Sequence, residues 1–215
     1  MKTTRQHQKH WEERKIDWQQ SYLDGIDPVS AQPMWNHPHR NVIVGALSSF
    51  PWISLMEVGC GAGANLKKIL HHFSNKQLVG IDVNKDAIEV ASKNFIGGIF
   101  KVGSVEEIPA SDESVDVVLS DATLIYVGPG RIRKVMRELG RVTRRKLVLC
   151  ELHEESMWKR WLYRFRTGYN VYNYKELLDE LGAYDVQMVK IPKNVWPGDP
   201  WARFGYVIKA SIPKI

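Results

Sequence analysis

The chain has 215 residues, of which 44% are hydrophobic and 25% charged, so it can bury one core and suits one domain with an embellishment better than two. No run approaches the roughly 18 consecutive apolar residues of a membrane span, and residues 1–15 are too polar for a secretory signal. We therefore expect a cytoplasmic protein with no membrane partner.

The positive charge and the two cysteines narrow the chemistry only slightly. A formal net charge of +6 mildly favours an anionic partner, nucleic acid among them. Cys60 and Cys150 lie in apolar surroundings without CxxC or histidine spacing, so neither a disulfide framework nor a zinc site is predicted.

The expected elements alternate after an N-terminal appendage. Residues 1–23 have the pattern of an amphipathic helix and 40–49 that of a short one, so residues 1–50 are predicted to form a helical cap. Short apolar runs predict strands at residues 53–58, 77–82, 98–102, 115–120 and 146–151. Helical spacing predicts helices at residues 64–73, 85–94 and 129–143, then a helical insertion at about 155–182 and extended segments at 184–191 and 204–210. The alternation predicts an α/β fold for residues 51–215, Rossmann-like and doubly wound, with a mostly parallel seven-stranded sheet and helices on both faces.

Ligands of such a sheet bind beyond the carboxyl ends of its strands. The residues expected at that rim are 57–63, 82, 103–105, 121–126 and 151–154. No tryptophan occurs between residues 53 and 157, whereas the flanking segments contain Trp11, Trp18, Trp35, Trp158, Trp161, Trp196 and Trp201. These aromatic residues either close over the rim as a substrate cleft or cement both ends of the chain to the sheet.

Three glycines, Gly59, Gly61 and Gly63, stand where the first predicted strand turns into a helix. Glycines at such a turn let the backbone approach a nucleotide closely. With Ala64 they also satisfy GxGxxG/A, so an NAD-dependent oxidoreductase is an alternative.

Of the two carboxylates at the strand ends, Glu57 favours a different cofactor. Glu57 would repel a pyrophosphate but could pair with an ammonium group, such as that of S-adenosylmethionine. Asp82 ends the second strand and can accept hydrogen bonds from two ribose hydroxyls, which fits either cofactor.

Four motifs in order carry a family resemblance, namely residues 57–63, 78–82, 103–109 and 114–118. Over roughly residues 55–151 the sequence resembles the class I S-adenosylmethionine-dependent methyltransferases, especially the small-molecule group called methyltransferase type 11. The resemblance implies S-adenosylmethionine as cofactor, S-adenosylhomocysteine as product, and a reversed last strand, for which residues 204–210 are the candidate.

The resemblance also implies roles for single residues. Glu57 and the glycines Gly59, Gly61 and Gly63 would hold the methionyl group, Asp82 the ribose, and Val83 would pack on adenine. Ser104 stands where the family usually has an aspartate that bonds the adenine amino group, and Val105 would lend its backbone N–H. Asp121 and Arg40 complete the expected cofactor contacts, with Arg40 reaching the cofactor carboxylate or forming a capping salt bridge.

Methyl transfer from a sulfonium is an in-line displacement, so the protein mainly supplies alignment, exclusion of water and sometimes a base. His153 and Tyr126 are the predicted catalytic residues, with Asp121 as a further candidate base. For His153, a hydrogen-bonding role after a strand is the alternative. His37 and His39 lack a nearby carboxylate in sequence, so no metal is predicted.

The sequence thus predicts a methyltransferase with a small-molecule acceptor and leaves three alternatives. The acceptor could be RNA, bound by basic residues interleaved with aromatic ones at residues 158–166. The protein could be an NAD-dependent oxidoreductase, or a module that binds S-adenosylmethionine without catalysis.

Overall fold

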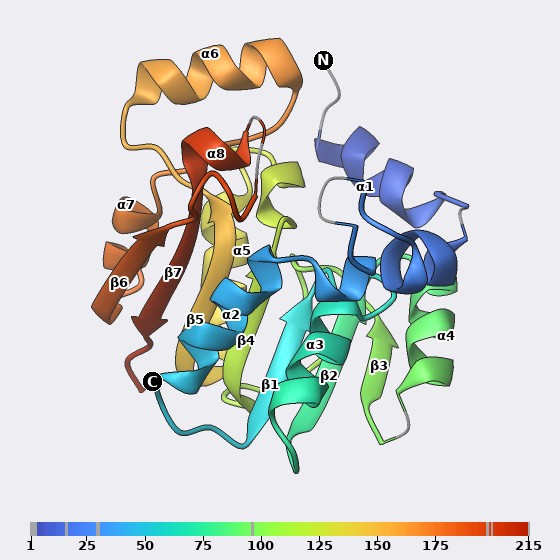
Figure 1. Cartoon of the computed structure of the whole chain (residues 1–215). Coiled ribbons are helices and arrows are strands. Elements are labelled where there is room, and N and C mark those ends of the chain that lie inside the picture. Colours follow the sequence, from blue (N-terminus) through green and yellow to red (C-terminus); the bar gives the residue numbers. More distant parts are fainter. Residues whose placement is uncertain are drawn as a thin grey trace.

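The computed structural model describes residues 4–15, 17–28, 31–95, 97–196, 198 and 200–214. Its centre is a seven-stranded sheet in the order β3-β2-β1-β4-β5-β7-β6 (Figure 1). The strands are β1 (Ser54–Val58), β2 (Gln77–Asp82), β3 (Ile99–Val102), β4 (Val115–Asp121), β5 (Thr143–Leu152), β6 (Tyr184–Lys190) and β7 (Gly205–Ser211). Strands β1 to β5 run parallel, and β7 is antiparallel to both β5 and β6. The predicted Rossmann-like sheet with its reversed last strand is confirmed.

Helices cover both faces of this sheet. They are α1 (Thr4–Glu12), α2 (His39–Ser48), α3 (Ala64–His72), α4 (Lys85–Asn94), α5 (Ile132–Val142), α6 (Met157–Thr167), α7 (Tyr174–Asp179) and α8 (Trp201–Phe204), with the short helices η1 (Gln19–Asp24), η2 (Met34–Asn36) and η3 (Leu124–Tyr126). Within the described residues, none of them is both long and apolar enough to cross a membrane.

Neighbouring residues of the central strands pack into opposite apolar clusters. Leu55 and Val117 belong to the cluster that includes α2 and α3, whereas Met56 and Val118 belong to the cluster that includes α5 and α7. Side chains alternate between the faces of a strand, and strands buried on both faces read as continuous apolar runs. This explains why the sequence shows the central strands so clearly.

The predicted helix at residues 1–23 and the predicted strand at residues 146–151 differ from the elements that the structure shows. Instead of one helix over residues 1–23, α1 ends at Glu12 and the π-helix η1 begins at Gln19, while residues 1–3 and 16 lie outside the described part. Strand β5 begins at Thr143, three residues before its predicted start, and Thr143 pairs with Val115 of β4.

The N-terminal segment is tied to the sheet through Asn84, which lies just beyond β2. The Asn84 side chain caps α4 by accepting a hydrogen bond from the Ala87 N–H at 2.9 Å. Its Nδ2 donates to the backbone oxygens of Trp11 and Arg14 at 2.6 and 3.1 Å. One amide therefore fixes both the start of α4 and the chain that covers the carboxyl ends of the strands (Figure 1).

Candidate active site

A cavity of about 400 Å³ lies at the carboxyl ends of β1, β2 and β4, beneath the N-terminal segment. Its walls come from the strand ends, from the chain before β1 and from the loop before α8. The lining residues used below are Trp11, Trp18, His37, His39, Arg40, Glu57, Gly59, Gly61, Asn65, Asp82, Val83, Ser104, Val105, Glu106, Asp121, Thr123, Tyr126 and Trp196.

The glycine turn after β1 shapes the floor of this cavity. Gly59, Gly61 and Gly63 all have positive φ, at 70°, 53° and 88°. A Cβ on Gly59 would lie 2.0 Å from Thr123 Oγ1, and one on Gly63 would lie 2.5 Å from the Phe95 ring. By contrast, a Cβ on Gly61, which faces the cavity, would have no atom of the other described residues within 4 Å, apart from its chain neighbours. Gly59 and Gly63 are therefore required for packing, and Gly61 leaves open space for a ligand.

Asp82 closes the turn from the side of β2. One carboxylate oxygen accepts the Gly61 N–H at 2.8 Å and the other accepts the Asn84 N–H at 2.8 Å. Burial raises the pKa of Asp82 despite these bonds. Since each carboxylate oxygen has two lone pairs, both oxygens can still accept a hydrogen bond from a ligand hydroxyl group in the cavity.

Glu57 presents one unsatisfied oxygen in the buried floor. Its side chain is almost fully buried, and Oε1 accepts a hydrogen bond from Asn65 Nδ2 at 2.6 Å. Oε2 has no hydrogen-bond partner among the described residues. Burial raises the pKa of Glu57 to about 8. A ligand cation next to Oε2 would satisfy this oxygen and favour the charged carboxylate.

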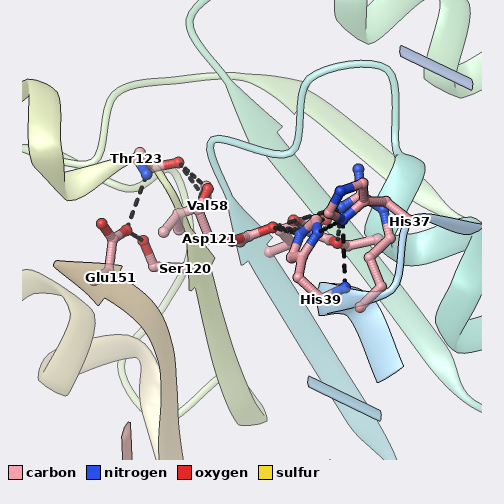
Figure 2. A network of polar contacts seen from close by, with 10 residues as sticks. His37, His39, Val58, Ser120, Asp121, Thr123 and Glu151 are labelled. Carbon is pink, nitrogen blue, oxygen red and sulfur yellow. Dashed lines mark hydrogen bonds and ion pairs between the residues drawn. The ribbon is translucent and has the colours of Figure 1, made fainter. Parts of the chain in front are cut away.

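Asp121 joins the floor to the segment before β1. Its Oδ2 lies 3.0 Å from His39 Nε2 and accepts a hydrogen bond from Asn65 Nδ2 at 2.9 Å (Figure 2). Arg40 Nη1 donates to Asn65 Oδ1 at 2.9 Å and lies 3.7 Å from Asp121 Oδ2. Burial acts to raise the pKa of Asp121, but His39, Arg40 and Asn65 hold it well below its usual value. Asp121 is therefore a buried carboxylate that fixes its neighbours in place.

His37 and His39 form a pair on the same wall. Their Nδ1 atoms lie 2.5 Å apart (Figure 2). The His39 ring packs against Trp196 with centroids 3.9 Å apart. Burial lowers the pKa of both histidines, that of His39 to about 4. Both imidazoles are therefore neutral near pH 7 and able to accept a proton.

A second polar network holds the turn after β4. Glu151 Oε1 accepts hydrogen bonds from Ser120 Oγ and from the Thr123 and Leu124 backbone N–H groups, at 2.8, 2.9 and 3.0 Å (Figure 2). Thr123 Oγ1 in turn donates to the Val58 carbonyl at 3.3 Å. Burial raises the pKa of Glu151 to about 7. Glu151 therefore positions the backbone that leads from Asp121 into η3.

Tyr126 lies in the aromatic wall opposite the floor. Its ring centroid is 5.2 Å from that of Trp11 in an edge-on contact and 5.7 Å from that of Tyr169. Burial raises the pKa of Tyr126 well above its usual value, so the phenol stays neutral. The indole N–H groups of Trp11 and Trp18, buried in this wall, have no partner among the described residues.

His153 lies away from the cavity, among β5, α7 and β7. Its Nδ1 accepts the Tyr174 N–H at 3.1 Å, and its ring packs edge-on against Tyr206. This geometry supports the hydrogen-bonding role of His153, which follows the end of β5 but does not line the cavity. Gly63, at the start of α3, does not border the cavity either.

The structure brings ten of the predicted site residues to one cavity: Arg40, Glu57, Gly59, Gly61, Asp82, Val83, Ser104, Val105, Asp121 and Tyr126. The sequence analysis missed Asn65 and Glu106 and considered His37 and His39 only as metal ligands. Asn65 offered a signal, since a polar side chain in the first turn after the glycines faces the strand ends.

Comparisons with known proteins agree with this geometry. Residues 55–146 match a family model described as a methyltransferase domain. An uncharacterized protein of Streptomyces fradiae transposon TN4556 is 27% identical over 131 residues, which cover 57% of this chain and 37% of that protein. Malonyl-acyl-carrier-protein O-methyltransferase of Bacillus cytotoxicus is 31% identical over 77 residues, covering 35% of this chain and 27% of the relative. The chain thus spans well under half the length of these curated relatives.

Solved structures share the fold over nearly the whole chain. N-methyltransferase NodS of Bradyrhizobium japonicum, solved with S-adenosylhomocysteine, has a TM-score of 0.69 and 17% identity and covers 99% of this chain and 100% of its own. Magnesium protoporphyrin IX methyltransferase of Synechocystis, solved with S-adenosylmethionine, has a TM-score of 0.68 and 12% identity and covers 99% and 98%. At these identities the likeness establishes the fold.

Proposed function

We propose that this protein is a class I S-adenosylmethionine-dependent methyltransferase, because residues 55–146 match a methyltransferase-domain model, and that it methylates a small-molecule acceptor. Bound S-adenosylmethionine supplies a methyl group attached to a sulfonium sulfur. Transfer of this methyl group leaves S-adenosylhomocysteine. The protein's own contribution is to bind, align and exclude water.

The observation that carries this proposal is the unsatisfied oxygen of Glu57 beside the open space at Gly61. The Glu57 carboxylate would bind the cofactor ammonium, and the buried Arg40 Nε, which has no partner among the described residues, would bind its carboxylate. In its ionised form Glu57 would attract an ammonium group and repel a pyrophosphate, which supports S-adenosylmethionine over NAD.

The other end of the cavity supplies contacts for the nucleoside. Asp82 would accept the ribose hydroxyls, and Val83 would pack on the adenine. Ser104 Oγ already accepts the Glu106 N–H at 3.2 Å, and its hydroxyl can bond the ring. Glu106 lies on the same wall and pairs with Arg131 at 2.6 Å. Its carboxylate is near Ser104, the position where the family has an aspartate.

The acceptor would lie between the cofactor and the aromatic residues Trp11, Tyr126 and Trp196. Enclosure by walls from both ends of the chain supports a small molecule rather than a polymer. For an acceptor that must lose a proton, His37 is the base that the geometry supports, because it borders the cavity and pairs with His39, itself beside Asp121. Tyr126 would orient the acceptor as a neutral phenol.

The proposal is tested by binding and then by transfer. We expect S-adenosylhomocysteine at about 100 times its Kd to stabilise the protein by about 2.7 kcal/mol in a thermal melt, and NAD to give no shift. Labelled S-adenosylmethionine, offered with small-molecule extracts or with total RNA, should label the small-molecule fraction.

The Asp82→Asn variant, which keeps the size of the side chain, should lose most of both signals. A shift with NAD alone would overturn the cofactor assignment. Label found only in RNA would overturn the small-molecule acceptor, and binding without label in any fraction would leave a non-catalytic module.

A further inference from the structure

Helix α6 stands at the outside of the molecule, beyond α8 (Figure 1). Ser156 caps its start by accepting the Lys159 N–H, and Gly168 ends it with φ of 78°. Tyr163, its one buried residue, packs edge-on against Phe204 of α8 with ring centroids 5.1 Å apart. The helix is therefore anchored through a narrow face, and most of its surface is exposed.

The exposed side of α6 is apolar. Met157, Trp158, Trp161 and Phe165 are 77%, 65%, 53% and 67% exposed. At 100° per residue these four positions fall within an arc of about 100° on the helix. The protein has eight tryptophans, and the two that are exposed both lie in this stripe. Isolated exposed apolar residues need no explanation, but four on one helical face mark an interaction surface.

Positive charge lies along one edge of the stripe. The charged residues of α6 are Lys159, Arg160, Arg164 and Arg166, and the helix contains no acidic residue. Helical spacing places Arg160 and Arg164 along one edge of the stripe, whereas Arg166 and Lys159, which pairs with Glu154 at 3.3 Å, lie on the far side of the helix. An apolar stripe with a cationic edge is complementary to a surface with an apolar interior and anionic groups above it.

We propose that α6 binds the surface of anionic phospholipid bilayers, with its apolar stripe at the boundary between headgroups and acyl chains and its basic residues on the lipid phosphates. Trp and Phe at this depth and basic residues at the headgroups are what interfacial helices use. The expectation of no membrane partner rested on the lack of a spanning segment, and an interfacial helix needs none.

The arrangement of the rings favours lipid over RNA. Trp158 stacks on Trp161 with centroids 5.0 Å apart and planes 21° apart, and Trp161 stacks on Phe165 at 5.5 Å and 13°. Rings that cover one another form a continuous apolar slab. Proteins that bind single strands instead present ring faces on which successive bases stack.

The loop that follows α6 contacts the wall of the cavity. The loop after α6 bonds to η3, because the Asn170 backbone N–H and Nδ2 both donate to the Ile125 carbonyl at 3.0 Å. In the same loop Tyr169 contacts Tyr126 of the cavity. A bilayer bound at α6 would therefore lie next to the acceptor side of the site, although the binding itself does not depend on methyl transfer.

Vesicle flotation with the full chain tests the proposal. We expect the protein to float with phosphatidylcholine vesicles that contain about 30% phosphatidylglycerol, and its partition to fall about tenfold or more with phosphatidylcholine alone. The combined substitution Trp158→Ser, Trp161→Ser and Phe165→Ser should reduce partition to anionic vesicles at least tenfold without lowering the melting temperature. Ile53→Ser, at a 65% exposed apolar residue far from α6 in sequence, is the matched control and should not change partition.

Charge is tested separately. The pair Arg160→Gln and Arg164→Gln should reduce binding to anionic vesicles on the order of tenfold and leave the weak binding to neutral vesicles unchanged. Three outcomes would overturn the proposal: no flotation with anionic vesicles, an equal loss in the Ile53→Ser control, or a dimer in sedimentation velocity that the triple substitution dissociates. Binding of labelled single-stranded RNA that the same substitutions abolish, without flotation, would assign the surface to nucleic acid instead.

Discussion

The buried carboxyl group of Glu57 makes cofactor binding depend on pH. With a pKa of about 8 in the cofactor-free protein, this group is roughly 90% protonated at pH 7. An ammonium ion binds the carboxylate, so binding at pH 7 should release about 0.9 proton per protein. The apparent Kd is weakened by the fraction of protein that carries the carboxylate, about twofold at pH 8, elevenfold at pH 7 and a hundredfold at pH 6.

Isothermal titration calorimetry with S-adenosylhomocysteine measures both quantities. We expect the Kd to weaken about fiftyfold from pH 8 to pH 6. Titrations at pH 7 in two buffers with different ionisation enthalpies should give the released proton from the difference in heat. A Kd that changes less than threefold over this range, or the absence of proton release, would refute the role of Glu57.

The Glu57→Gln variant separates binding from stability. A carboxyl group whose pKa rises from 4.5 to about 8 on folding stabilises the protein below pH 4.5 and loses that contribution as the pH rises through 8. At pH 7 the loss is at most about 3 kcal/mol. The variant should therefore melt several degrees above the wild type without cofactor, yet gain nothing from S-adenosylhomocysteine and show no pH-dependent Kd. A lower melting temperature would contradict this reasoning.

Further substitutions test the glycine turn and His153, which lies outside the cavity. Gly59→Ala should destabilise the protein by about 2–3 kcal/mol, because its Cβ would collide with Thr123 and its φ is positive. Gly61→Ala should cost only about 1–2 kcal/mol of backbone strain, because its Cβ meets open space. The Gly61→Ala variant should nevertheless bind S-adenosylhomocysteine more weakly. Thermal melts with and without ligand distinguish the two, and equal destabilisation would count against the open space at Gly61. His153→Leu should leave the Kd and methyl transfer within about twofold while lowering the melting temperature by a few degrees, since the Tyr174 N–H loses its acceptor. A large loss of transfer at unchanged stability would instead support His153 as a base.

Local sequence was enough to predict the cofactor end of the site. Glycines at a strand-to-helix turn and carboxylates at strand ends act through their own backbone positions, and Glu57, Gly61 and Asp82 meet because parallel strands end at one edge. The acceptor end could not be predicted in this way. His153 follows a strand as expected, but the packing of α7 and β7 around it decides where its ring points. His37 belongs to a loop whose position depends on long-range contacts.

Tryptophans near the two ends of the chain lie in two different surroundings, the cavity wall and the outer surface, which the sequence could not distinguish. Trp11, Trp18 and Trp196 line the cavity, whereas Trp158 and Trp161 are exposed on α6. Composition gives the same signal in both cases. Only the direction in which each helix face points distinguishes a cavity wall from an outer surface.

The cavity described above is closed by residues from both ends of the chain, from Trp11 to Trp196. Bringing together points so far apart costs loop-closure entropy, which grows with the logarithm of the separation, so this site forms only when nearly the whole chain has folded. A ligand at this site binds only the complete fold, so its binding free energy stabilises every element against unfolding. Protection against proteolysis by S-adenosylhomocysteine should therefore extend from α1 to β7 as one cooperative unit.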